Sequence, residues 1–265
     1  MSEQSTISLL QYDLSLERLQ LLPEDHQAVI SVLSYAVSEV NALQRVFLAQ
    51  ELKLTGTDAI NSAIKIQYFV ILRAWSSKIY EALKFMQDLL WSNKPTTKDP
   101  VLLKLADGLA DEFQALRAGG GFEVSRIVRN EAANHYSFSA ALKNLSHIRK
   151  EADCNFYTHE YGGNDFFPLG EEVMFQARLE RKWTNFGRKE EKDSRFKEWL
   201  DWNLQATEWL GKTHAGFCNQ LVFIPSRNNE MREVVYDVPT DLVGHPPNKK
   251  TPVFFDKPAS GATMK

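Results

Sequence analysis

Cysteine is scarce in this sequence: Cys154 and Cys218 are the only two among 265 residues. They form neither a CxxC pair nor a regularly spaced framework, so the sequence supports neither a disulfide-stabilised scaffold nor a cysteine zinc site. The first residues also lack the basic region and the apolar run of a secretory signal. We therefore expect two reduced thiols and a cytoplasmic location.

Long apolar runs are absent as well. A helix that spans a bilayer needs about 20 consecutive apolar residues, and the apolar stretch 68–72 stops at Arg73. We expect no transmembrane helix and no membrane partner. A large charge of one sign is also missing, because the net charge is only -3. Such a charge gives no overall attraction to nucleic acid, so any RNA binding must depend on a local site.

Apolar residues do recur at steps of three and four, which is the spacing of amphipathic helices. This spacing predicts helices over about 24–52, 60–90, 100–118 and 123–150. Asp99 and Pro100 favour the start of the third helix, and the glycines at 119–121 favour its end. Short connections between such helices predict an all-α, up-down four-helix bundle. Its core is expected to contain Val32, Val40, Ile64, Ile71, Leu105, Leu109 and Leu142.

The helical pattern breaks at 152–170, which we interpret as an irregular connection that is either functional or merely long. A short helix is predicted near 171–183, followed by a long helix capped by Ser194. The tail holds six of the ten prolines and is expected to be extended, with a short strand at 234–236. The predicted domains are a helical bundle over 1–151 and, over 152–265, a helical extension with an extended, proline-rich tail. We expect this extension to pack on the bundle through Trp199, Trp202 and Phe217.

The chemically most informative residues lie late in the first half. Arg129, Asn130 and His135 combine a permanent cation shaped for phosphate, an amide and a side chain that titrates near neutrality. This set suits RNA cleavage, in which the 2′-hydroxyl loses a proton, the 5′-oxygen gains one, and negative charge builds on the phosphorane. Histidine can transfer protons while arginine stabilises the charge.

The spacing of Arg129 and His135 constrains this interpretation. Six residues of regular helix rise about 9 Å and leave the two side chains roughly 120° apart. One copy of the motif therefore makes a poor pocket, whereas a two-fold dimer would bring two copies together. The alternative is an ordinary surface, with Arg129 exposed and His135 paired with Glu131 at i,i+4.

The segment 127–136, with the sequence IVRNEAANHY, resembles the signature of the HEPN superfamily. That signature is an Arg followed by a polar residue and, after four to six intervening residues, a His. Here five residues intervene, and Arg129, Asn130 and His135 are the matching positions. The resemblance covers roughly residues 24–150 and extends to abortive-infection and toxin-type members.

The resemblance implies a metal-independent endoribonuclease of toxin–antitoxin or phage-defence systems, without a cofactor or a metal and with a composite site between two protomers. Arg129, Asn130 and His135 would then be catalytic, and Tyr136 and Arg126 would bind substrate. RNA, a second copy of the chain and an antitoxin protein are the expected partners. The alternative is a catalytically inactive HEPN-like scaffold that binds RNA, a nucleotide or a partner protein. A third hypothesis is a helical adaptor in which the motif is coincidental.

Overall fold

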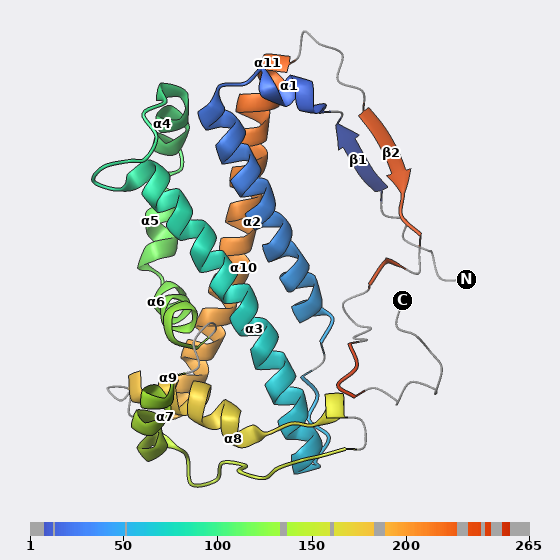
Figure 1. Cartoon of the computed structure of the whole chain (residues 1–265), viewed down its shortest axis with the longest axis vertical. Helices are drawn as coiled ribbons and strands as arrows, with labels where there is room; N and C mark the ends of the chain where they lie inside the picture. The colour runs from blue at the N-terminus through green and yellow to red at the C-terminus, as the bar shows by residue number, and fades with distance from the viewer. Residues whose placement is uncertain are drawn as a thin grey trace.

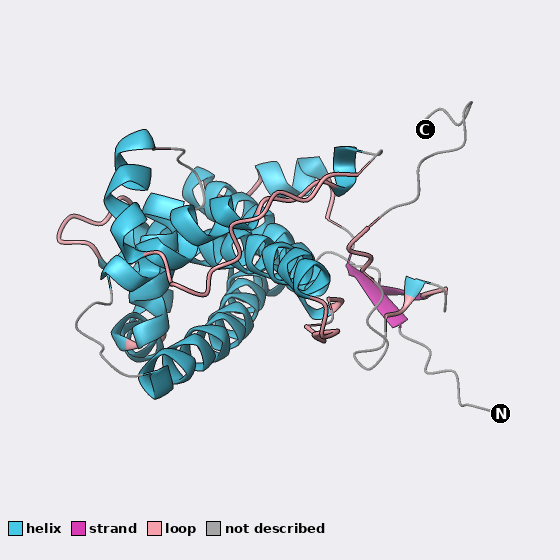
Figure 2. Cartoon of the chain, turned by 90° about the horizontal axis from the view of Figure 1, so that it is seen from below, coloured by secondary structure: helices cyan, strands magenta, loops and turns pink. Residues whose placement is uncertain are grey.

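The computed structural model describes residues 8–12, 14–50, 52–132, 137–159, 162–182, 189–226, 233–239, 242–244 and 251–254. Most of these residues are helical, so the predicted all-α class is confirmed (Figures 1 and 2). None of the described helices combines the length and the hydropathy that crossing a bilayer would require.

Three long helices form the body of the molecule. They are α2 (Glu24–Leu48), α3 (Asp58–Met86) and α10 (Lys189–Cys218), and Figure 1 shows them running alongside one another. Helix α10 packs against α2, α3 and the shorter α6 (Gly120–Ile127). Two tryptophans bond across the core: Trp199 Nε1 donates to Ser76 Oγ at 2.9 Å, and Trp75 Nε1 donates to Thr207 Oγ1 at 3.1 Å.

One apolar core contains residues of both predicted domains, whose boundary was placed at residue 151. Trp199, Trp202 and Phe217 belong to the same buried cluster as Leu33 and Trp75. The prediction that the extension packs on the bundle through these three aromatic residues is therefore confirmed. The physical reason is the apolar stripe of α10, whose residues recur on one helical face and are buried together.

Two of the predicted core residues are exposed. Val40 and Ile64 are buried, and Ile71, Leu105 and Leu109 pack partly buried against the core. The prediction that Val32 is a core residue is wrong. Its neighbour Leu33 faces the core, and one residue along a helix turns the side-chain direction by about 100°. The prediction that Leu142 is a core residue is wrong as well, because Leu142 lies on a short helix whose single buried residue is Asn144.

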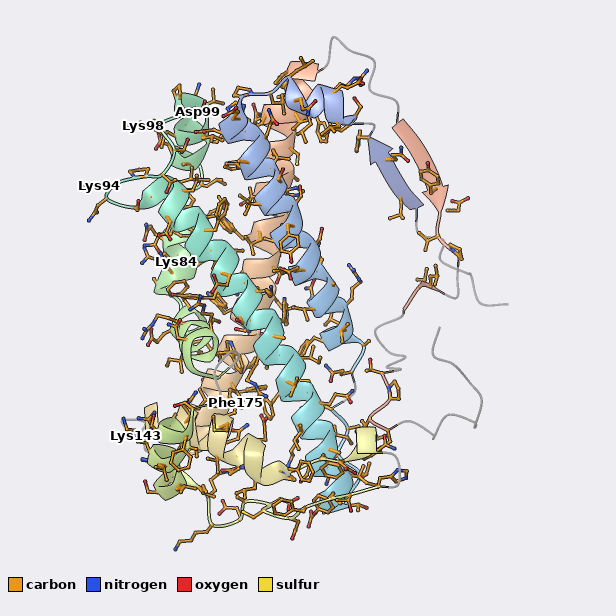
Figure 3. The ribbon with its side chains drawn as sticks, in the orientation of Figure 1. Lys84, Lys94, Lys98, Asp99, Lys143 and Phe175 are labelled. Atoms are coloured by element: carbon orange, nitrogen blue, oxygen red, sulfur yellow. The ribbon has the colours of Figure 1, made fainter. Side chains whose placement is uncertain are left out.

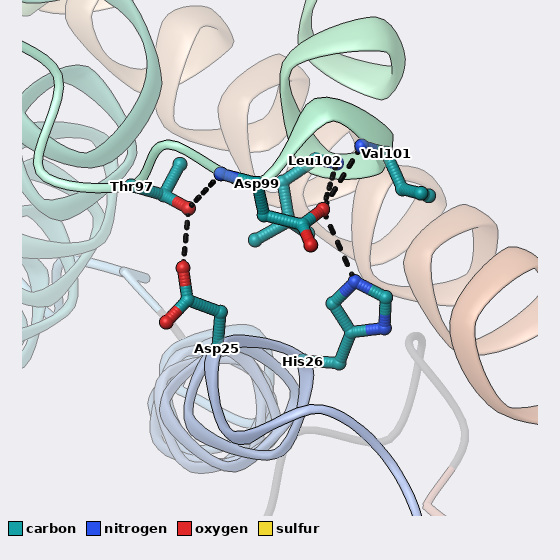
Figure 4. A network of polar contacts seen from close by, with 6 residues as sticks. All are labelled: Asp25, His26, Thr97, Asp99, Val101 and Leu102. Atoms are coloured by element: carbon teal, nitrogen blue, oxygen red, sulfur yellow. Dashed lines mark hydrogen bonds and ion pairs between the residues drawn. The ribbon is translucent and has the colours of Figure 1, made fainter.

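The predicted third helix is divided into α4 (Pro100–Asp107) and α5 (Ala110–Ala118). Its start is as expected: Asp99 Oδ1 accepts hydrogen bonds from the backbone N–H groups of Val101 and Leu102, both at 2.9 Å. Figure 4 shows how this cap is joined to α2, since His26 Nε2 lies 3.2 Å from the same carboxylate oxygen. Thr97 completes the link by donating to Asp25 Oδ2 at 2.6 Å.

The glycines at 119–121 do end α5, but two of them also begin the next helix. Gly120 and Gly121 form the first turn of α6, against α10. A Cβ atom added to Gly121 would lie 2.3 Å from Cβ of Trp202, a separation that real side chains do not adopt. The absence of a side chain therefore lets the two helices approach closely.

The predicted fourth helix, over 123–150, is wrong as a single element. The chain instead forms α6, the π-helical turn η2 (Val128–Ala132), α7 (Phe138–Asn144) and the short 3-10 turn η3 (Leu145–His147). Ser137 caps α7 by accepting from the backbone N–H of Ala140 at 3.2 Å. The long helix that packs with α2 and α3 is thus α10, which lies beyond the segment predicted to form the bundle.

The remaining predictions are met in part. Helix α10 begins at Lys189, so Ser194 lies inside it and is not its cap. The helix predicted near 171–183 is formed by three consecutive elements: α8 (Pro168–Glu171), η5 (Glu172–Gln176) and α9 (Ala177–Lys182). The strand predicted at 234–236 is β2 (Glu233–Asp237), which pairs antiparallel with β1 (Ser8–Tyr12), a strand that was not predicted.

The other described elements are short. They comprise α1 (Leu16–Gln20), η1 (Gln87–Trp91), η4 (Gly162–Asn164), η6 (Asn219–Phe223) and α11 (Ile224–Ser226).

Candidate functional site

The motif begins on the π-helical turn η2, directly after α6. Val128 is fully buried against the core and anchors this turn, while Arg129 is half-buried and Asn130 is exposed. Single π-helical turns widen the backbone at one point and are frequent at functional sites. Here the turn places the arginine beside α3, which η2 contacts directly.

Two neighbours hold the guanidinium of Arg129. Its Nε donates to a carboxylate oxygen of Glu81 on α3, and its Nη1 donates to Asn130 Oδ1 at 2.9 Å. Its Nη2 has no hydrogen-bond partner among the residues that the structure describes. The side chains of Arg129 and Glu81 are 38% and 44% exposed, so the ion pair lies at the surface and the free edge of the guanidinium can reach a ligand.

Glu81 was missed by the sequence analysis. It lies 48 residues before Arg129, on another helix, and no local pattern marks it. Its contact with Arg129 depends on the way that α3 and η2 face one another, which is a tertiary property. Glu81 could have been identified only from the packing of α3 against η2, which the sequence does not give.

Arg126, predicted to bind substrate, forms a bidentate ion pair with Glu123 one turn earlier on α6. Its Nε donates to Oε2 at 2.8 Å and its Nη2 donates to Oε1 at 2.6 Å. Both side chains are about half exposed. The structure therefore brings together Arg129, Asn130 and Glu81, and it keeps Arg126 in a separate pair.

His135 and Tyr136 lie outside the described residues, and so does the alternative pairing of His135 with Glu131. Helix α7 follows these positions, and together with Leu145, the first residue of η3, it carries an apolar stripe at i, i+4 and i+7, called here the stripe of α7. Phe138 is 81% exposed, Leu142 54% and Leu145 51%. Figure 3 shows Lys143 on the outside of the same helix. The stretch that follows the motif thus turns large apolar side chains outward.

A second candidate site is a cavity of about 600 Å³ at the first turns of α3. Its first wall is one face of α3, with residues at steps of three and four: Asp58, Asn61, Ser62, Lys65, Ile66 and Phe69. Its second wall is the irregular connection, in which every second residue from 149 to 157 faces the cavity. Residues 150 and 151 form a turn, closed by the hydrogen bond from the backbone N–H of Ala152 to the carbonyl of Arg149, and the chain continues without helix or strand over 152–156. The connection that the sequence left as functional or merely long is therefore a wall of this cavity.

The third wall comes from α8 and η5 and carries two acidic residues. Glu171 forms an ion pair with Arg73, and both side chains are nearly buried, at 13% and 12% exposed. The guanidinium of Arg73 also lies 4.5 Å from the ring centre of Phe175, a buried residue that is labelled in Figure 3. Burial raises the pKa of Glu171, and the charge of Arg73 opposes this only in part. Glu172 is paired with Arg149 through two hydrogen bonds of 3.0 and 2.6 Å.

Within the described part of the chain, no group of three or more His, Cys, Asp or Glu side chains is arranged to hold a metal ion. Cys154 and Cys218 are free thiols. Cys218 lies 3.3 Å from His214 Nε2, and burial raises the pKa of the thiol, so the reactive thiolate is disfavoured there.

Comparison with known proteins finds no matching family model, no matching curated protein and no matching solved structure. The function must therefore be argued from the residues of the two sites themselves.

Proposed function

We propose that the protein is a metal-independent endoribonuclease of the HEPN type, acting as a homodimer in toxin–antitoxin or phage-defence systems. The observation that carries the proposal is the position of Arg129. Its guanidinium is oriented by Glu81 and Asn130 at a partly exposed surface, with Nη2 unpaired among the described residues. An arginine in this state can bind a phosphate without first being ordered.

The chemistry assigns a separate task to each residue. The unpaired edge of Arg129 would bind the scissile phosphate and stabilise the charge that builds on the phosphorane. His135 would take the proton of the 2′-hydroxyl or give one to the leaving 5′-oxygen. Glu81 would act as a positioning residue, because it holds the arginine through Nε and leaves the far edge of the guanidinium for RNA.

Dimerisation is supported by the apolar stripe of α7, which follows the motif directly. A second copy that packed on Phe138, Leu142 and Leu145 would bury three side chains that are now at least half exposed. The same contact would bring two copies of the motif toward one axis, since an isologous interface duplicates every residue. An antitoxin that covered this stripe would compete with the dimer.

The second candidate function is the catalytically inactive scaffold, and Glu81 is the observation that favours it. A carboxylate in contact with Arg129 repels phosphate and neutralises the arginine. If the ion pair stays closed, Arg129 serves the fold and the exposed face of α7 binds a partner protein.

Incubation of the purified protein with total RNA in EDTA separates the two functions. The ribonuclease should cleave RNA but not DNA, and leave 2′,3′-cyclic phosphate ends, because only RNA has the attacking 2′-hydroxyl. His135→Ala should lower the rate by about 10² to 10⁴, the usual contribution of proton transfer. Arg129→Lys should rescue Arg129→Ala poorly, since a point charge does not reproduce a bidentate fork.

Two matched controls lie on described helices. His147→Ala removes a histidine of η3, and Arg45→Ala removes an exposed arginine of α2, far along the sequence from the motif. Both should cleave at the wild-type rate. A wild type that leaves RNA intact, or a His135→Ala variant that cleaves equally well, would exclude the ribonuclease and favour the scaffold.

A further inference from the structure

We infer that the cavity at the start of α3 is a binding site for a small organic polyamine, in which ammonium groups are separated by methylene chains. The inference is independent of the proposed ribonuclease. The site lies on α3, the irregular connection and α8–η5, whereas the motif lies on η2. Its volume of about 600 Å³ is in the range of small-molecule sites.

The cavity is assembled by three elements that each direct a regular set of side chains into it. The α3 wall follows the helical period, and the connection alternates side chain by side chain from Arg149 to Tyr157. The third wall, which includes Pro168 and Glu171, again follows the helical period. Side chains from three separate stretches of the chain therefore enclose this space.

The charges of the lining favour a cation. Five carboxylates line the cavity, against the two basic side chains of Lys65 and Arg149. Arg149 is already paired with Glu172. One carboxylate, Asp153, is saturated by protein donors: Ser62 Oγ at 2.6 Å, Tyr157 OH at 3.1 Å, and the backbone and side chain of Asn155. Arg73 does not line the cavity but pairs with Glu171, so three cations in all offset five carboxylates. The remaining excess of two negative charges disfavours a phosphate or a nucleotide.

Glu171 is the carboxylate to which an ammonium group of the ligand would donate a hydrogen bond. Its side chain is 13% exposed, and its Oε1 accepts from Arg73 Nη1. Its second oxygen, Oε2, has no hydrogen bond among the residues that the structure describes. This oxygen faces the cavity and is open to solvent there, so an ammonium group in the cavity could take the place of water and donate to it.

The lining also distinguishes an organic cation from a metal ion. No described group of acidic or histidine side chains is arranged for metal coordination. The same cavity presents apolar surface from Ile66, Phe69 and Pro168. Methylene chains can pack on this surface while the ammonium groups reach Glu171 at the inner end and Asp58 or Glu151, which are exposed. Alternating apolar and cationic segments are the chemistry of a polyamine.

Isothermal titration of the full-length protein with spermidine tests this inference. Spermidine and putrescine should bind, whereas butane-1,4-diol, which has the carbon chain of putrescine but no charge, should not. AMP serves as the anionic probe and should not bind. Binding of the diol or of AMP as tight as that of the amines would overturn the inference, and so would the absence of heat with either amine.

Three variants locate the binding. Glu171→Gln keeps the shape and removes the charge, and it should weaken spermidine binding by about tenfold. Because this change also alters the pair with Arg73, a second variant changes only the exposed carboxylates: Asp58→Asn with Glu151→Gln should weaken binding several-fold. Asp107→Asn, an exposed acid on α4, is the control and should bind as the wild type does. Wild-type affinity in both cavity variants would show that spermidine binds elsewhere and would overturn the site.

Discussion

Helix α10 and the segment 120–147 are both helical, but they are built for different tasks. Helix α10 runs without a break for 30 residues, whereas the described residues of the segment 120–147 form the shorter elements α6, η2, α7 and η3. Trp199, Ala206 and Leu210 of α10 are at most 1% exposed. In contrast, α7 turns Phe138 and Leu142 toward solvent. The apolar stripe of α10 is thus buried along the core, whereas the broken segment is divided: α6 and Val128 join that core, and α7 presents its apolar side chains at the surface.

The strongest test of this contrast is to weaken α10. Trp199→Ala removes a buried aromatic ring and its hydrogen bond to Ser76, and leaves a cavity between α10 and α3. We expect the free energy of unfolding in urea to fall by about 3–5 kcal/mol, the usual cost of such a deletion. Leu204→Ala, on the exposed side of the same helix, is the control. A cost below about 1 kcal/mol for Trp199→Ala would contradict the central place of α10 in the core.

The contact between the two regions can be tested at Gly121. Gly121→Ala places a methyl group 2.3 Å from Cβ of Trp202, so α6 and α10 must move apart. We expect a loss of about 1–3 kcal/mol, as for other overpacked sites. Gly211→Ala is the matched control, because it lies in the middle of α10 with open space around it. That change should stabilise by about 0.5–1 kcal/mol, and equal effects at both positions would refute the close approach.

The cap of α4 gives a smaller effect with a pH signature. Burial acts to raise the pKa of Asp99, but the backbone N–H of Leu102, then His26 and the N–H of Val101 outweigh it and hold the pKa below the ordinary value. A lowered carboxyl pKa contributes stability above the unfolded pKa, and this contribution is lost as the pH falls through the folded pKa. Asp99→Ala should therefore cost about 1 kcal/mol at neutral pH.

The pH dependence separates the cap from general packing. The difference between wild type and Asp99→Ala should shrink below about pH 4, where the carboxylate becomes protonated. Asp99→Asn should cap α4 nearly as well at neutral pH and lack this dependence. Chemical denaturation at several pH values measures both, and a difference that stays constant with pH would contradict the ionic cap.

The smallest effect on stability is expected at the motif itself. Glu81→Gln and Arg129→Ala break an ion pair whose members are 44% and 38% exposed. Pairs this exposed contribute at most about 1 kcal/mol. Both variants should therefore unfold at nearly the wild-type denaturant concentration, even where activity is lost. A loss above about 2 kcal/mol would show that Arg129 serves the fold.

The parts of the fold that depend on local sequence were predictable. The apolar spacing of α2, α3 and α10 predicted these helices, and Asp99 before Pro100 predicted the start of α4, because both signals act within one or two turns. Whether an apolar side chain is buried depends on tertiary packing and not on the local sequence. The stripe of α7 has helical spacing but stays at least half exposed, so a long fourth helix was predicted where short pieces form.

The two sites show the same limit. Arg129 and Asn130 were chosen from the sequence, and the contact between them is local. Glu81, 48 residues away, could not be chosen, because the packing of η2 on α3 brings it to Arg129. The cavity combines α3 with a connection that has no regular pattern, so its walls could not be matched before the chain was folded. His135 and Tyr136 remain predictions.

The most direct test of the ribonuclease is a defined RNA in which a single cleaved nucleotide carries 2′-deoxyribose. Cleavage by wild-type protein in EDTA is mapped beside Arg129→Ala and Glu81→Gln. The mechanism predicts that the cut is lost at the deoxy position alone and persists at neighbouring sites, because the attacking hydroxyl is missing only there. Both variants should cut slowly throughout. Continued cleavage at the deoxy position, or full activity of Arg129→Ala, would contradict attack by the 2′-hydroxyl at a phosphate held by Arg129.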